Sequence, residues 1–288
     1  MKISKTLILL SSLIALLAAV YAAVGLFWLG DGAPFAFTSP RGQQVELFGR
    51  GVYRFDTTFF ASGFRGADLI TLFLAVPLMI AAIWHYRRGS LRGGLVLIAS
   101  LVYMLYNGLS LGAGAAYNPL FLLYTALFSA SLFALGIAWA QIDFAALPTT
   151  PRRGAAIFLV IGGIVTALLW LSDLLPPLLQ GGHPPALLGP YTTPITYFID
   201  LALITPACLL AGRWLLRGDP RGAVAGFALL YLLALMGCIV LSQTLFQINA
   251  GVAFNPAQLV AMIGSWIVMG AIAVWFVVKI LRNIATKA

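Results

Sequence analysis

Two stretches of the chain decide its fold: "ADLITLFLAVPLMIAAIWHYRRGSLRG" at residues 67–93 and "IDLALITPACLLAGRWLLRGDPRG" at residues 199–222. Each contains an apolar run of about 20 residues, the length of helix that crosses the hydrocarbon core of a membrane. Each run ends in a short turn that contains arginine and glycine. Both stretches therefore predict a membrane-spanning helix that stops at a basic turn.

The composition extends this interpretation to the whole chain. Hydrophobic residues make up 61% of the 288 residues and charged residues only 9%, whereas a soluble protein carries about 25% charged residues. The alternation of polar and apolar residues that is typical of a membrane β-barrel does not occur. The sequence predicts an all-α polytopic membrane protein with eight transmembrane helices, at residues 6–29, 67–86, 94–114, 119–140, 155–175, 194–216, 223–245 and 256–280.

The charged residues assign the two sides of the membrane. With eight spans, thirteen basic residues and two aspartates fall on one side, a net charge of +11, and the other side has a net charge of −2. The basic residues of the first side are Lys2, Lys5, Arg87, Arg88, Arg92, Arg152, Arg153, Arg213, Arg217, Arg221, Lys279, Arg282 and Lys287. The positive-inside rule places this side, and with it both termini, in the cytoplasm. Contacts with the lipid bilayer explain the basic charge, so no nucleic acid is expected as a partner.

The chain repeats itself at a separation of 129 residues. Arg88 and Arg217 are separated by this distance, as are Pro77 and Pro206. The matched residues predict two four-helix units, 1–145 and 146–288. An even number of spans in each unit makes the two copies parallel in the membrane. Each matched proline removes a backbone hydrogen bond from the middle of a span, and a matched pair of broken helices points to a binding site at the midplane.

Two aspartates within or beside the spans are candidate ligand-binding residues. Asp68 opens the second predicted span, and Asp200 lies about two turns inside the sixth. Relative to the prolines, Asp200 sits three residues deeper, so the two acids share roughly the same helix face. Asp68 has a purely structural alternative as a helix N-cap. An acid inside a span is a functional candidate by default, and its alternative is an interior pair with an arginine.

Polar residues of the third and seventh spans are the next candidates. Tyr103, Asn107 and Ser110 follow the i, i+4, i+7 spacing of one helix face, and Gln243 lies in the equivalent seventh span. Hydrogen bonds between helices explain such residues as well as ligand binding does. Both interpretations stay open.

A long outer loop, predicted at residues 30–66, supplies the remaining candidate. It mixes aromatic residues with Arg50, Arg54 and Arg65, and a loop of this length that is not a linker is often functional. We expect it to fold over the outer mouth of the helices, with Arg65 near the two aspartates.

The inventory of reactive residues argues against most enzyme classes. The two histidines, His85 and His183, fall on opposite sides of the membrane, and no CxxC, HExxH, GxSxG or P-loop motif occurs. We therefore expect no metal site, no cofactor and no catalytic residue of these classes. The remaining enzyme hypothesis is an intramembrane enzyme that uses the pair Asp68 and Asp200.

Three phrases carry a resemblance: "RGADLITLFLAVPL" at 65–78, "YNPLFLLYTALFSASL" at 117–132 and "YTTPITYFIDL" at 191–201. They resemble stretches of uncharacterised bacterial multi-pass membrane proteins. The resemblance implies a bacterial cytoplasmic membrane and an eight-span fold, and it transfers no activity.

Three functions remain. The first is a protein that binds or moves a small or lipid-like ligand between its two units. The second is a structural or assembly subunit of a membrane complex, whose acids only cap helices. The third is the aspartate-pair enzyme.

Overall fold

Eight helices of the computed structural model are long and apolar enough to cross a membrane. The structure describes residues 3–144, 147, 152–181, 185 and 188–284. Lys2, Lys287 and the expected unit boundary at residues 145 and 146 lie outside the described residues. The candidate spans are Lys5–Phe27, Thr58–Arg87, Leu91–Gly114, Phe121–Ala140, Arg153–Leu179, Ile195–Leu216, Pro220–Asn249 and Gln258–Asn283. The prediction of an all-α protein with eight spans is confirmed.

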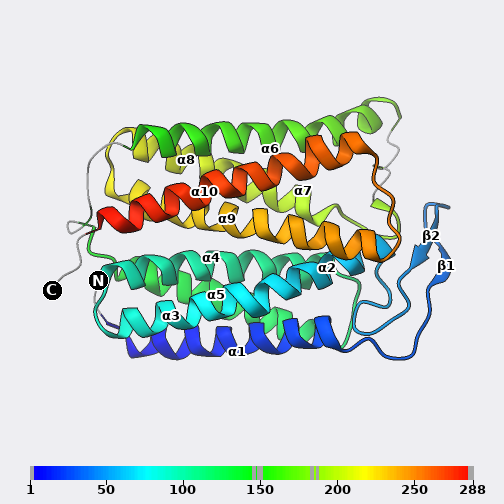
Figure 1. The fold of residues 1–288 in the computed structure, drawn as a ribbon, viewed down its shortest axis with the longest axis horizontal. Helices are drawn as coiled ribbons and strands as arrows, with labels where there is room; N and C mark the ends of the chain where they lie inside the picture. Colours follow the sequence, from blue (N-terminus) through cyan, green and yellow to red (C-terminus); the bar gives the residue numbers. More distant parts are fainter. Residues whose placement is uncertain (1–2, 145–146, 148–151, 182–184, 186–187, 285–288) are drawn as a thin grey trace.

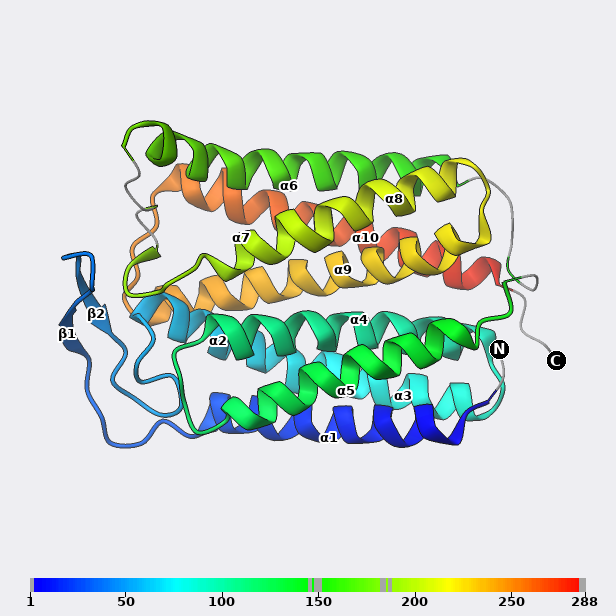
Figure 2. The same cartoon turned by 180° about the vertical axis from the view of Figure 1, so that it is seen from behind.

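The helices form two groups that follow the order of the sequence (Figures 1 and 2). One group, here called the N-terminal half, contains the four earlier spans. Its elements are α1 (Lys5–Phe27), α2 (Thr58–Ile70), the π-helix η1 (Thr71–Ala75), α3 (Val76–Arg87), α4 (Leu91–Gly114) and α5 (Phe121–Ala140). The C-terminal half contains α6 (Arg153–Leu179), α7 (Ile195–Ile199), the π-helix η4 (Asp200–Ile204), α8 (Thr205–Leu216), α9 (Pro220–Asn249), the π-helix η5 (Gln258–Gly264) and α10 (Ser265–Asn283).

The two ends of the bundle differ in structure and charge. A hairpin of β1 (Phe35–Thr38) and β2 (Gln44–Leu47) projects from one end, here called the hairpin end, with Phe35 opposite Leu47 in the antiparallel register. The start of α1 and the end of α10 lie together at the opposite end, here called the terminal end (Figure 1). The basic turns after α3 and α8 also lie at the terminal end.

The second span begins earlier than the sequence predicts. α2 starts at Thr58, with the Thr57 hydroxyl accepting a hydrogen bond from the Phe60 N–H as its N-cap. The predicted loop 30–66 is therefore shorter at its C-terminal end, and the predicted span 67–86 is longer. Asp68 lies inside the helix and is not its N-cap, so the capping explanation for this acid is wrong.

Each of the two matched prolines follows a π-helix. η1 ends two residues before Pro77, and η4 ends two residues before Pro206. Proline cannot donate a backbone hydrogen bond, and one wider turn lets the chain continue without a sharp break. Thr71 and Asp200 are the first residues of these two wide turns.

The contact between the halves is formed mainly by α9, which packs against α2 and α4. Gly66 of α2 lies so close to α9 that an added Cβ would be 2.5 Å from the Cα atom of Gln243. Small residues allow such close approaches between membrane helices. The glycine thus explains why the polar segment before Asp68 is helical: it is covered by α9.

The two halves close differently. In the N-terminal half α1 packs along α5, and Tyr21 contacts Tyr124 edge-on at 5.7 Å between ring centroids. In the C-terminal half α6 meets α10 near the terminal end, where the ring centroids of Phe158 and Phe276 lie 5.5 Å apart. Toward the hairpin end, residues of α6 and α10 line a cavity instead.

Candidate functional site

The main cavity of the described residues lies between the two halves, toward the hairpin end, and has a volume of about 460 Å³. Its wall combines α2 and α4 of the N-terminal half with α6, α7, α9, η5 and α10 of the C-terminal half. Residues of the loops before α7 and after α9 complete it. This volume is within the usual range of about 300–1,000 Å³ for small-molecule sites.

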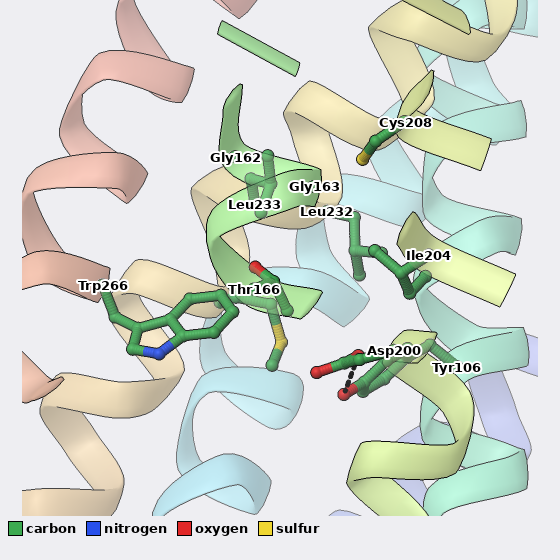
Figure 3. Close-up of a pocket in the computed structure, with 11 residues that line it drawn as sticks. Tyr106, Gly162, Gly163, Thr166, Asp200, Ile204, Cys208, Leu232, Leu233 and Trp266 are labelled. Carbon is green, nitrogen blue, oxygen red and sulfur yellow. Dashed lines mark hydrogen bonds between the residues drawn. The ribbon is translucent and has the colours of Figure 1, made fainter. Parts of the chain in front are cut away.

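Asp200 is the acidic group that the C-terminal half presents to this cavity. The π-helix η4 places it there, and the residue is 5% exposed. Its Oδ2 atom accepts a hydrogen bond of 2.9 Å from the indole N–H of Trp170 on α6. Its Oδ1 atom accepts one of 3.4 Å from the hydroxyl of Tyr106 on α4 (Figure 3). Both partners are neutral, so no cation balances this carboxylate in the described structure.

A second, smaller cavity of about 20 Å³ lies beside Asp200. It shares Tyr106, Asp200, Met236 and Trp266 with the main cavity. Figure 3 shows Trp266 and Asp200 on opposite sides of it. Its volume is enough for about one water molecule. Asp200 is therefore placed between two cavities, with apolar residues such as Leu232 toward the terminal end.

Asp68 also lines the main cavity, but the N-terminal half holds its carboxylate. The residue is 1% exposed, and its Oδ2 atom accepts a hydrogen bond of 2.9 Å from the hydroxyl of Tyr53. A Cβ atom added to Gly25 of α1 would collide with the same oxygen. Asp68 is therefore fixed by the outer loop and α1, whereas Asp200 is held by two long aromatic side chains.

Not all of the predicted candidates on α4 and α9 lie at the cavity. Asn107, Ser110 and Gln243 line the cavity. Tyr103 is fully buried elsewhere, and its hydroxyl pairs with Thr71 Oγ1 at 2.6 Å. The Asn107 Nδ2 atom is buried and has no hydrogen-bond partner among the described residues.

The expected arginine partner of the aspartates is not at the cavity wall. Arg65 donates a hydrogen bond of 3.1 Å to the Leu26 carbonyl, and its guanidinium lies over the ring of Phe246. The guanidinium of Arg54 lies over Phe55. Among the described residues neither wall aspartate lies in an ion pair within 4.0 Å, and such a pair joins Arg221 to Asp219 at the terminal end. Tyr106 and Trp170 are the partners of Asp200 in place of the expected arginine.

The outer loop is tied to the C-terminal half beside the cavity. Asp56 Oδ1 accepts hydrogen bonds from the Ala116 N–H and the Tyr191 hydroxyl, at 2.8 and 3.0 Å. Burial raises the pKa of the Asp56 carboxyl to about 7, although both hydrogen bonds lower it. Arg41 donates to the Tyr191 carbonyl at 2.9 Å. These contacts hold the loop against Tyr191, which is itself part of the cavity wall.

Aromatic side chains form the part of the wall that sequence analysis did not find. Trp170 stacks on Tyr197 with 4.2 Å between ring centroids, and the Tyr197 hydroxyl donates to Asp173 at 2.6 Å. Trp266 lines the same cavity from α10. The sequence shows these residues only as aromatics in apolar spans, a pattern equally typical of lipid-facing helices.

The wall also limits the chemistry of the site. Within the described residues no three His, Cys, Asp or Glu side chains gather as a metal-binding set, and Cys208 and Cys238 are both free thiols. Asp68 and Asp200 accept hydrogen bonds from different partners and do not bond to each other. Comparison of the chain with protein-family models, curated proteins and solved structures finds no match.

Proposed function

We propose that this integral membrane protein binds a small or lipid-like ligand in the cavity between its two halves. The observation that carries the proposal is a 460 Å³ space whose wall contains two buried aspartates, neither of which lies in an ion pair within 4.0 Å among the described residues. A buried carboxylate at the centre of a membrane costs roughly 2.5–3.5 kcal/mol on insertion scales. A positively charged group bound in the cavity would offset this cost.

The remaining polar groups of the wall support the same function. Asn107 and Ser110 of α4 line the cavity, and Gln243 lies on the facing helix α9. A few polar groups in a mainly apolar cavity are the usual composition of a small-molecule site. The smaller cavity beside Asp200 is lined by apolar residues such as Leu232 and Leu233, so the observations favour binding from the hairpin end over a polar path through the protein.

The proposal is tested by filling the cavity. Ser110 lines it and Ser172 is exposed on α6 outside it, so Ser110→Phe and Ser172→Phe introduce the same ring at different places. Native mass spectrometry of the purified protein should detect a bound molecule in the wild type and in Ser172→Phe, and none in Ser110→Phe. Equal occupancy in all three proteins, or none in the wild type, would contradict a ligand site here.

We further propose that the two halves are copies of one four-helix unit. The support is the separation of 129 residues, which relates Pro77 to Pro206 and the whole of η1 to η4. The copies would be related by an axis along the membrane normal. Superposition of α1–α5 on α6–α10 tests this, and a match that requires inversion of one half contradicts it.

We also propose that the protein lies in a bacterial cytoplasmic membrane with its terminal end in the cytoplasm. The support is the collection of basic turns at that end, which the positive-inside rule assigns to the cytoplasm. Single cysteines test the orientation in a background without Cys208 and Cys238. A thiol reagent added outside should label Val45→Cys and leave Ser90→Cys unlabelled, and the opposite labelling would reverse the proposal.

A further inference from the structure

We propose that the ligand is an organic cation, an ammonium group on a small or lipid-like molecule, which Asp200 and the aromatic side chains around it bind. This inference rests on the proposed function and names the class of its ligand. The structural basis is the combination of a carboxylate that has no ion-pair partner with tryptophan and tyrosine rings in one cavity.

The charge of the wall determines the sign of the ligand. Asp68 and Asp200 are the wall residues that carry a formal charge, and no Lys, Arg or His is present among the described residues of the wall. A buried charge is tolerated when it is paired. A cation would therefore gain at this site, and an anion would meet two carboxylates and no cationic residue of the described wall.

The hydrogen bonds of Asp200 indicate that it acts as an acceptor. Trp170 donates to one of its oxygens and Tyr106 to the other. A carboxylate that accepts on both oxygens uses its remaining lone pairs to receive further donors. A protonated amine offers such N–H donors. A quaternary ammonium group has no N–H and instead offers positively polarised methyl groups.

The aromatic residues provide the second half of an ammonium site. Trp170 and Tyr197 form a stacked pair, and Trp266 lies across the smaller cavity from Asp200 (Figure 3). The face of an aromatic ring attracts a cation, with tryptophan the strongest, and aromatic cages of this kind bind quaternary ammonium groups. The cavity is also large enough for the organic part of the ligand.

A chelated metal ion fits these residues less well. Ca²⁺ and Mg²⁺ are bound by several converging oxygen atoms, whereas Asp68 and Asp200 belong to different helices and each has its own donors. These contacts favour an amine or quaternary ammonium compound over a metal ion.

The experiment compares choline with 3,3-dimethylbutan-1-ol, its neutral isostere in which carbon replaces nitrogen. Binding to the purified protein in phosphatidylglycerol nanodiscs is measured by calorimetry. Choline should bind at least about tenfold more tightly than the alcohol, and Asp200→Asn should remove this preference. The factor of ten corresponds to 1.4 kcal/mol. Asp219→Asn, which changes an aspartate at the terminal end, should retain it.

A second pair of nanodiscs separates the two sources of an ammonium group. If the natural occupant is a lipid headgroup, phosphatidylethanolamine in the nanodisc should compete and raise the Kd of choline. If it is a free amine, the Kd should be the same in both membranes. Both results support an ammonium site.

Two results would overturn the inference. Equal affinity for choline and the alcohol, with both lost in Ser110→Phe, would leave the proposed ligand site intact and disprove its charge selectivity. Unchanged choline affinity in Asp200→Asn would show that the Asp200 carboxylate does not contribute to choline binding. If no bound molecule and no probe binding were found in the wild type, the proposed function itself would fail.

Discussion

The N-terminal and C-terminal halves place different residues at the same point of a similar helix. Thr71 begins the π-helix before Pro77, and Asp200 begins the π-helix before Pro206. Thr71 is fully buried and pairs with Tyr103, so its polar group is satisfied inside its own half. Asp200 takes its donors from α4 and α6 and faces a cavity. Where the N-terminal half has Tyr103, the residue 129 positions later is Leu232, which leaves room beside Asp200.

This difference separates a polar group that stabilises a helix bundle from one that is available to a ligand. Both groups are buried in a span, and the span alone does not distinguish them. What distinguishes them is whether the group borders a cavity: Asp200 lines one, whereas the Thr71 hydroxyl is fully buried beside its partner Tyr103. The N-terminal half is closed by the packing of α1 on α5, and the C-terminal half stays open where α6 and α10 line the cavity.

The largest effect on thermal stability is expected at the contact between the halves. Gly66→Ala would place a methyl group against the backbone of Gln243, and such overpacking costs about 1–3 kcal/mol. Gly136→Ala is the matched control, because a Cβ at this position of α5 meets no atom within 4 Å. Thermal unfolding in detergent should show a lower midpoint for Gly66→Ala only. Equal midpoints would mean that α2 and α9 do not pack this closely.

The next largest effect is the pH dependence of stability that arises from Asp56, in the loop that ties the N-terminal half to Tyr191. The pKa of Asp56 is raised from 3.8 to about 7 by burial. The folded state therefore binds the proton more tightly than the unfolded state, and stability falls as pH rises from about 4 to 7 and then levels off. Between pH 5 and pH 8 the titration of Asp56 should lower the free energy of unfolding by about 2.5 kcal/mol.

Asp56→Asn removes this titration while its amide oxygen still accepts from Ala116 and Tyr191. The unfolding midpoint of the wild type should fall between pH 5 and pH 8, and the fall should be smaller in Asp56→Asn. Parallel pH profiles of the two proteins would show that Asp56 is not buried as described.

The two aspartates should differ in their contribution to stability. Tyr53→Phe removes the hydrogen-bond donor that the N-terminal half supplies to the Asp68 carboxylate, and an unsatisfied buried group costs about 1–3 kcal/mol. Tyr106→Phe removes the longer hydrogen bond to Asp200, which keeps Trp170 and faces the cavity. The unfolding midpoint should therefore be lower in Tyr53→Phe than in Tyr106→Phe. The reverse order would make Asp200 the structural group.

Much of the fold could be predicted from the sequence because the membrane imposes long apolar spans. The exception was the start of the second span: Ser62 and Arg65 look like loop residues, but the segment is helical from Thr58 and Gly66 packs closely against α9. Pro77 and Pro206 signalled irregular helices, but the sequence does not distinguish a kink from a π-helix.

The candidate site was predicted less completely. Asp68, Asp200, Asn107 and Gln243 line one cavity, because polar residues in spans are rare enough to stand out. Their role in binding stays a prediction. Tyr106 was passed over for Tyr103, since helical spacing groups Tyr103 with Asn107 but does not say which way that face is turned. Tertiary packing of α4 against α7 and α9 sets that direction.

The most direct test of the account compares Thr71→Val with Asp200→Asn, and measures both the unfolding midpoint and the binding of choline. Valine has the shape of threonine but leaves the Tyr103 hydroxyl without its partner, which costs about 1 kcal/mol. The account predicts that Thr71→Val lowers the midpoint and keeps choline affinity, whereas Asp200→Asn keeps the midpoint and loses at least about tenfold in affinity. Loss of affinity in Thr71→Val, or a lower midpoint with unchanged affinity in Asp200→Asn, would contradict the assignment of the ligand site to the C-terminal half.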